Sequence, residues 1–147
     1  MSSPRQGKLP AEVYQAMYAA TGAAKKGLDP ALVELILIRA SQLNHCAYCI
    51  DMHIKDALAG GEREERIHLL AAWEEATGIY TEAERAALAL TEAVTVLTDG
   101  FVPDEVYARA AEHFDPTQLS HLVSLIGVIN FWNRFNVAFR TPPGHQR

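Results

Sequence analysis

Three residues able to carry chemistry follow one another at helical spacing. Cys46, Cys49 and His53 are separated by three and then four residues, and on an α-helix these offsets place all three side chains on one face. The free N–H groups and the positive dipole end at a helix N-terminus favour a thiolate. An ordinary thiol, with a pKa of about 8.5, is only a few per cent ionised at neutral pH. An imidazole one turn away is a suitable base, so the spacing indicates thiol chemistry assisted by His53.

A carboxylate inside an apolar segment is the second unusual feature. Glu34 lies in the segment 31–43, whose remaining residues are mostly leucine, isoleucine, valine and alanine. Burial there is unfavourable unless the carboxylate is paired or protonated. Ser41 lies seven residues later on nearly the same face. A buried carboxylate aimed toward an imidazole would make a proton relay, although an ion pair with Arg39 or Arg134 is the alternative.

The cysteine pair also has structural interpretations. Cys46 and Cys49 could be unreactive buried thiols, or they could bind zinc together with His53 and His45. A structural zinc site usually has a second ligand pair elsewhere, and none is evident in the sequence. The two cysteines close a loop too small to make a strong structural staple, and in a reducing compartment such a pair is typical of redox or metal chemistry.

Composition restricts the classes of partner. The chain has 147 residues, a net charge of −5 and no stretch in which lysine and arginine concentrate. Nucleic acid and anionic membranes attract basic surfaces, so neither is an expected partner. The segment Met1–Lys8 has no apolar run behind its charges and does not resemble a signal peptide. The apolar stretch Leu119–Trp132 is interrupted by polar residues and is too short to span a bilayer, so we expect a cytoplasmic protein.

The elements that must position these residues are all predicted to be helices. Caps, prolines and glycines delimit seven helical segments, at about 10–27, 31–43, 46–59, 62–76, 81–97, 103–114 and 116–139. Two of these segments open on Asp-Pro, and Thr81–Glu84 form a capping box. No segment alternates with period two, so we expect no strands. The prediction is a single all-α domain over 1–147, a multihelical bundle of about six or seven helices with its core at about 9–139.

The last helix carries aromatic and amide side chains that suggest association. Its aromatic residues fall mostly at helical spacing, which is typical of core and subunit interface rather than of a ligand box; they are Phe131, Trp132, Phe135 and Phe139. Asn130, Asn133 and Asn136 interleave with them and could satisfy one another across an interface. The apolar surface is generous for one small subunit, so we expect a homo-oligomer.

The residues identified above resemble a known motif. Glu34, eleven residues, Cys46-x-x-Cys49, three residues and His53 resemble the pattern of alkylhydroperoxidase D-like (AhpD-like) proteins of the carboxymuconolactone decarboxylase family. Arg39-Ala-Ser41-Gln-Leu-Asn44 and Trp73-Glu-Glu-Ala-Thr are also similar to segments of that family. The resemblance extends over roughly Leu9 to Phe139.

The resemblance implies a function and a role for each residue. It implies an all-α fold assembled into trimers or hexamers, and reduction of organic hydroperoxides with electrons from an external dithiol or thioredoxin-like protein. No cofactor or metal is implied. Carried over by position, Cys49 is the peroxidatic cysteine and Cys46 the resolving cysteine. His53 passes a proton from Cys49, Glu34 completes the relay, and Ser41 and Asn44 support the site.

One position departs from the pattern. The peroxidase members carry a histidine before the second cysteine, where this chain has Tyr48. A phenol is not a base at neutral pH, although it can donate a hydrogen bond, so Tyr48 is expected to be a supporting residue. Two other functions remain open: a lactone decarboxylase of the same family, which needs acid and base groups but no cysteine pair, and a non-catalytic redox switch.

Overall fold

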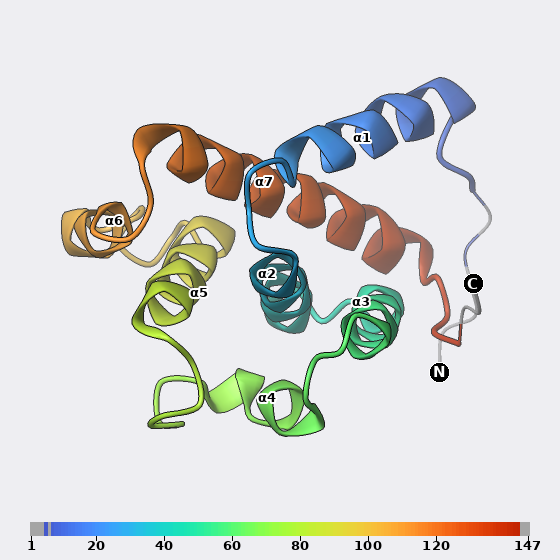
Figure 1. The fold of residues 1–147 in the computed structure, drawn as a ribbon. Helices are drawn as coiled ribbons and strands as arrows, with labels where there is room; N and C mark the ends of the chain where they lie inside the picture. The colour runs from blue at the N-terminus through green and yellow to red at the C-terminus, as the bar shows by residue number, and fades with distance from the viewer. Residues whose placement is uncertain (1–4, 6, 145–147) are drawn as a thin grey trace.

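The computed structural model describes residues 5 and 7–144, and over these residues it contains helices and no strands. The helices are α1 (Ala11–Ala24), α2 (Pro30–Leu43), α3 (Ala47–Ala59), α4 (Glu64–His68), α5 (Glu82–Thr95), α6 (Asp104–Ala111) and α7 (Pro116–Phe139), with a 3₁₀ turn at Leu70–Ala72. Figure 1 shows α1 and α7 along one side of the bundle and α2 near its middle, between α3, α5 and α7. The prediction of an all-α bundle of six or seven helices is confirmed.

The predicted start signals lie where the helices begin. Thr81 precedes α5, and its hydroxyl accepts a hydrogen bond from the Glu84 N–H at 3.1 Å while the Glu84 carboxylate accepts one from the Thr81 N–H at 2.8 Å. Asp115 and Gln118 form the same reciprocal pair at the start of α7. These contacts satisfy N–H groups that have no partner within the helix, which explains why sequence signals located both boundaries.

Helix α2 is apolar nearly all round because it separates two hydrophobic clusters. Leu32 and Ile36 face the larger cluster, which α5 and α7 complete. Leu35 and Ile38 face the smaller cluster, which contains Trp73. All four α2 residues are at most 4% exposed, as expected for a helix packed on most sides. The carboxylate of Glu34 is therefore carried by the most enclosed helix of the bundle.

The prediction of one continuous helix over 62–76 is wrong. The structure has the short helix α4, then a 3₁₀ turn and further turns. Ile67, Leu70 and Trp73 are all buried in the smaller cluster, and they are spaced three residues apart. A 3₁₀ helix has three residues per turn and aligns such residues on one side, whereas an α-helix would rotate them progressively away from the core.

Helix α7 is longer than the apolar stretch identified in the sequence. It has 24 residues and is, by length and composition alone, long and apolar enough to cross a membrane. The expectation that this region is too short is therefore wrong for the whole helix, because Phe135 and Phe139 extend its apolar character beyond Trp132. In the fold, α7 packs against α1, α2 and α5 and supplies buried residues such as Leu122 and Ile126 to the larger cluster.

The aromatic residues of α7 are partly exposed rather than buried. Trp132 packs edge-on against Phe131 and against Tyr14 of α1, with ring centroids 5.4 and 5.7 Å apart, and its indole N–H donates to the Thr21 hydroxyl at 3.0 Å. Tyr18, also on α1, is 68% exposed. The cluster thus joins α1 to α7 and leaves an apolar surface on the outside.

Candidate active site

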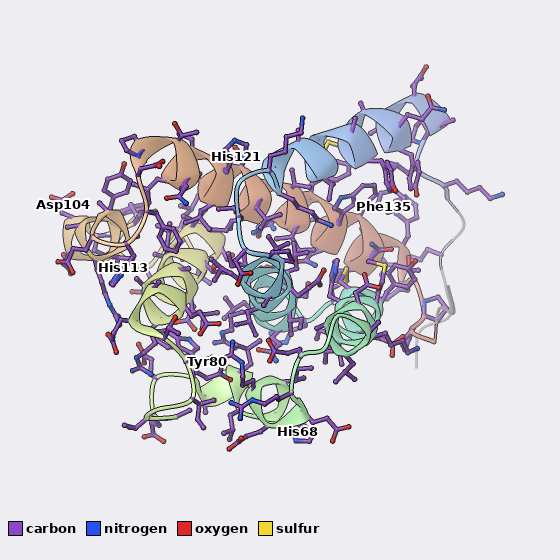
Figure 2. All side chains as sticks on the ribbon, viewed as in Figure 1. His68, Tyr80, Asp104, His113, His121 and Phe135 are labelled. Carbon is purple, nitrogen blue, oxygen red and sulfur yellow. A yellow bond between two sulfur atoms is a disulfide. The ribbon has the colours of Figure 1, made fainter. Side chains whose placement is uncertain are left out.

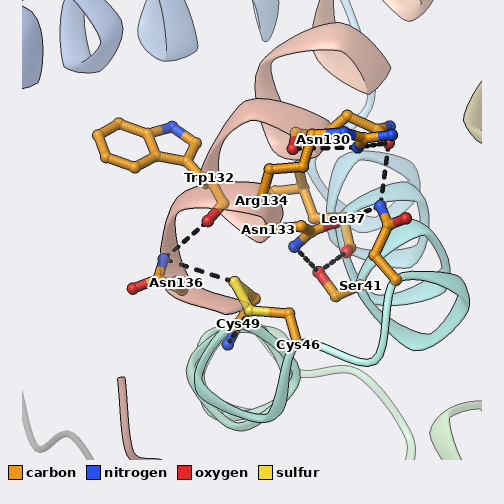
Figure 3. The surroundings of a disulfide bond; sticks show 10 residues. Leu37, Ser41, Cys46, Cys49, Asn130, Trp132, Asn133, Arg134 and Asn136 are labelled. Carbon is orange, nitrogen blue, oxygen red and sulfur yellow. Dashed lines mark hydrogen bonds between the residues drawn. A yellow bond between two sulfur atoms is a disulfide. The ribbon is translucent and has the colours of Figure 1, made fainter. Parts of the chain in front are cut away.

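The two cysteines lie at the N-terminus of α3 and form a disulfide. Cys46 is the N-cap of α3, and its Sγ accepts a hydrogen bond from the backbone N–H of Cys49 at 3.3 Å. The disulfide joins Cys46 to Cys49, whose Cα atoms are 5.3 Å apart (Figure 3). Each cysteine is only 1% exposed. The pair therefore has the helix-terminal position at which a thiolate is stabilised.

A tight connection places α3 back against α2. The backbone N–H of Cys46 donates to the carbonyl of Ser41 at 3.0 Å, and His45 adopts a left-handed conformation with φ 55°. Histidine is among the non-glycine residues that tolerate this region. The side chain of His45 is exposed, and the residue contributes to this connection through its backbone conformation. Because the connection is short, the side chains of α2 and α3 meet directly.

Glu34 and His53 meet across these two helices. Glu34 Oε2 lies 3.3 Å from His53 Nδ1, and the side chains are 20% and 10% exposed. Both atoms are buried, yet neither makes a hydrogen bond among the described residues. Neither alternative ion pair is formed among the described residues: Arg39 bonds to Glu92 at 2.9 Å, and Arg134 donates to the Asn130 side chain at 2.7 Å. The structure thus brings Glu34 to His53, one helical turn after Cys49.

A second acidic side chain lies near the same point. Asp56 Oδ2 is 4.0 Å from His53 Nδ1, and ligand atoms of Glu34, His53 and Asp56 all lie within 4.8 Å of one another. One imidazole and two carboxylates are donors that a divalent cation could use. This group lacks the cysteines and His45, so it differs from the zinc site considered from the sequence. A buried carboxylate beside an imidazole is equally the arrangement of a proton relay.

A chain of side-chain amides lies beside the disulfide. The Asn44 amide donates to Asn130 and Asn133 at 2.9 and 3.0 Å. Asn133, which is fully buried, donates to the Ser41 hydroxyl at 3.0 Å, and Ser41 donates to the Leu37 carbonyl at 2.7 Å. Ser41 and Asn44 therefore connect the α2–α3 turn to α7. The asparagines Asn130, Asn133 and Asn136 all find hydrogen-bond partners within the chain, so their amides do not need a subunit interface to be satisfied.

One further amide reaches the disulfide itself. Asn136 Nδ2 lies 3.7 Å from Cys49 Sγ, and Figure 3 shows it approaching from α7. The two residues are 87 positions apart, so no local pattern indicated the contact. Its only signal in the sequence was the asparagine series of α7. Tyr48, predicted as a supporting residue, is partly buried on α3.

A charged cluster supports the segment between α3 and α5. Arg66 bonds to the carboxylates of Glu62 and Glu84 and to the Ile79 carbonyl. Burial raises the pKa of the Glu84 carboxyl, but hydrogen bonds from Arg66 and Thr81 outweigh it and hold that pKa below its usual range. The hydrogen bond to Glu84 likewise raises the pKa of Arg66. These mutually paired charges stabilise the fold around the smaller cluster.

Three further histidines lie on or next to elements other than α3, at whose N-terminus the cysteine pair lies. Figure 2 shows His68 on α4, His113 just after α6 and His121 on α7. The ring of His121 contacts the Ala24 carbonyl at 3.1 Å, which links α7 to the end of α1. Of the described histidines, His53 is the one that shares a helix with Cys49, one turn further along α3.

Comparison with known proteins identifies relatives over most of the chain. The model of the carboxymuconolactone decarboxylase family matches residues 11–93. The uncharacterized protein YdfG of Bacillus subtilis (strain 168) is 50% identical over 105 residues, which are 71% of each chain. The uncharacterized protein YnjA of Escherichia coli (strain K12) is 32% identical over 115 residues, covering 78% of this chain but only 62% of that protein.

A solved structure shares the whole fold. It is the crystal structure of a protein of unknown function from Agrobacterium tumefaciens, described as a candidate antioxidant defence protein AhpD. The two chains are 34% identical, with a TM-score of 0.92, and the match covers 98% of this chain and 100% of the other. The similarity therefore includes every helix that builds the site.

Proposed function

Because the chain belongs to the carboxymuconolactone decarboxylase family and is AhpD-like, we propose that it is a thiol peroxidase that reduces organic hydroperoxides in antioxidant defence. The observation that supports the proposal is the disulfide between Cys46 and Cys49 at a helix N-terminus. His53 lies one helical turn after Cys49, and the partly buried Glu34 faces it. A cysteine pair that closes so small a loop is suited to reversible oxidation more than to holding a fold together.

In the proposed cycle the thiols supply two electrons. His53 accepts the proton of the Cys49 thiol, and the thiolate attacks one peroxide oxygen. The O–O bond breaks, the alkoxide takes the proton held by His53 and leaves as the alcohol, and Cys49 becomes a sulfenic acid. The Cys46 sulfur then attacks the Cys49 sulfur, water leaves and the disulfide forms. An external dithiol reduces it and is itself oxidised to a disulfide.

Glu34 acts in this cycle through His53. Its carboxylate lies 3.3 Å from Nδ1, so it can hold the ring with the other nitrogen directed along α3 and can stabilise the imidazolium that forms. Glu34 Oε2 and His53 Nδ1 are buried atoms without a hydrogen bond among the described residues, and they are the pair that a transferred proton would join.

The electron donor, the assembly and the compartment are parts of the same proposal. Both cysteines are buried, so the reductant has to be a slender dithiol or a thioredoxin-like protein that opens the α3–α7 contact.

Tyr14 and Tyr18 of α1 are exposed next to the partly exposed aromatic residues of α7, and a second copy would cover them. We expect a trimer or hexamer in the cytoplasm, which size-exclusion chromatography with light scattering and cell fractionation would test.

The decisive experiment starts from reduced protein, and counts thiols and measures intact mass before and after one equivalent of an organic hydroperoxide. Wild type should lose both thiols and the mass of two hydrogen atoms. Cys46→Ser should retain a sulfenic acid at Cys49 and react once, whereas Cys49→Ser should not turn over. Unchanged steady turnover in Cys49→Ser would refute the proposal.

The family offers a second candidate, a lactone decarboxylase. The observation that favours it is the Glu34–His53 pair, which could act as acid and base without the cysteines. Release of carbon dioxide from 4-carboxymuconolactone by a variant lacking both cysteines would support it. A protein that is oxidised slowly and stoichiometrically, with no turnover under any reductant, would instead be a redox switch.

A further inference from the structure

The sulfur of Cys49 has a hydrogen-bond donor from another helix. Asn136 Nδ2 lies 3.7 Å from Cys49 Sγ, in the contact between α3 and α7. The Cys46 sulfur instead receives the backbone N–H of Cys49, at 3.3 Å, as the N-cap of α3. The two sulfurs thus accept hydrogen bonds from different donors. The Cys46 sulfur accepts from a backbone N–H at the helix N-terminus, and the Cys49 sulfur accepts from a side-chain amide of α7.

The amide orientation of Asn136 follows from its surroundings. Its Nδ2 also donates to the Trp132 carbonyl at 2.9 Å, so the two hydrogens of one NH₂ group face two acceptors, a carbonyl oxygen and a sulfur. The flipped amide would place Oδ1 against the Trp132 carbonyl, which is repulsive. The contact with Trp132, four residues earlier on α7, therefore holds an N–H toward Cys49 (Figure 3).

Cys49 needs such a donor more than Cys46 does. Cys49 is the third residue of α3, and its own N–H is committed to the Cys46 sulfur. Like Cys46, it is only 1% exposed, and burial among apolar groups disfavours a thiolate; unlike Cys46, its sulfur accepts no backbone N–H among the described residues. Hydrogen bonds to a charged acceptor are among the stronger ones in proteins. A donor aimed at Cys49 would offset the effect of burial at that sulfur specifically.

We propose that Asn136 is a further catalytic residue, whose side-chain N–H stabilises the Cys49 thiolate and so makes Cys49 the cysteine that attacks. This inference rests on the proposed thiol chemistry of Cys49. His53 removes the proton from the thiol, and Asn136 stabilises the charge left on sulfur. When peroxide converts the thiolate to a sulfenic acid, the same N–H can donate to the oxygen that sulfur has gained.

The test measures the pKa of Cys49 in the absence of peroxide. In a Cys46→Ser background Cys49 is the only thiol, and serine is a preferred N-cap that preserves the start of α3. The thiolate absorbance and the rate of alkylation by iodoacetamide are followed against pH, with and without Asn136→Leu. Leucine has a similar size but cannot donate. Asn136→Ala replaces it should the leucine variant fail to fold.

Asn136→Leu should raise the Cys49 pKa by about one unit and slow alkylation about tenfold near neutral pH. The two rates should converge at alkaline pH, where both thiols are ionised. Asn133→Ala is the matched control, because it removes an amide from the same helix that does not contact sulfur. Its Cys49 pKa should equal that of the background protein even though its stability falls.

Two results would overturn the inference: an unchanged Cys49 pKa in a folded Asn136 variant, or an equal rise in Asn133→Ala. Because alkylation needs no peroxide, its outcome is independent of the peroxidase assay. A wild type that fails to reduce hydroperoxides while its Cys49 pKa depends on Asn136 would refute the peroxidase function and leave the donor role supported.

Discussion

Reduction of the disulfide should leave the protein folded and only modestly less stable. The bond closes a loop of four residues, from Cys46 to Cys49, which are three apart in sequence. The chain-entropy relation for so small a loop gives about 6 cal/mol/K, or about 2 kcal/mol at room temperature. The N–H groups that face the two sulfurs come from Cys49 and Asn136, and thiols can accept both, so reduction removes no further hydrogen bond.

Urea unfolding with and without a dithiol reductant measures this difference. We expect a loss of about 2 kcal/mol, which in a domain of this size lowers Tm by about 4–8 °C. A variant with serine at both positions, Cys46→Ser with Cys49→Ser, is the control: its stability should not respond to reductant and should be close to that of reduced wild type. A loss above about 4 kcal/mol, or unfolding on reduction, would show that the disulfide is a structural staple and would refute the argument for a redox cycle.

Three further perturbations test the surrounding structure. Arg66→Met should destabilise the protein by about 3–5 kcal/mol at neutral pH by stranding the Glu84 carboxylate. The folded-state pKa of Glu84 lies below its ordinary value of 4.5. The contribution of the ionised carboxylate to the free energy of unfolding is therefore complete above pH 4.5 and is lost as the pH falls through the lower folded-state pKa. Urea titrations across acidic pH should show this loss of stability in wild type and not in the variant. Asn133→Ala should lower the unfolding free energy by about 2 kcal/mol, since it removes two hydrogen bonds of about 1 kcal/mol each and its partners retain others. His53→Gln should slow oxidation of the reduced thiols by about 100-fold or more in stopped-flow assays with an organic hydroperoxide, and Glu34→Gln should slow it less, because Glu34 acts through His53.

Each of these predictions has an outcome that contradicts it. An Arg66 variant with the same acid dependence as wild type would mean that Glu84 is held by other groups. A fully stable Asn133→Ala would show that the amide chain contributes no net stability. Glu34→Gln with a larger effect than His53→Gln would place Glu34, rather than His53, next to the reacting sulfur.

Local patterns predicted the fold class and half of the candidate site. The capping boxes before α5 and α7 act through residues three apart, and the cysteine spacing puts both sulfurs at the first turn of α3. Such features depend only on neighbouring residues and the helical repeat, so they can be predicted from the sequence alone. The apolar character of α2 likewise predicted its central position.

Local patterns failed where packing competes with propensity. The segment 62–76 has the composition of one helix, but the structure buries Ile67, Leu70 and Trp73 together through a short helix followed by a 3₁₀ turn. Sequence spacing also allowed Glu34 a choice between His53 and an arginine. In the structure, the packing of α2 on α3 brings Glu34 to His53, and Arg39 forms an ion pair with Glu92 instead.

The sequence by itself indicated that Cys49 and His53 share one face of a helix that begins beside Cys46, because residues four apart on a regular helix lie on the same face. Only the tertiary structure decided what surrounds them. Glu34 reaches His53 from α2, and Asn136 reaches Cys49 from α7, 87 residues away. Contacts between helices depend on how whole elements pack and cross, and no short window of sequence contains that information.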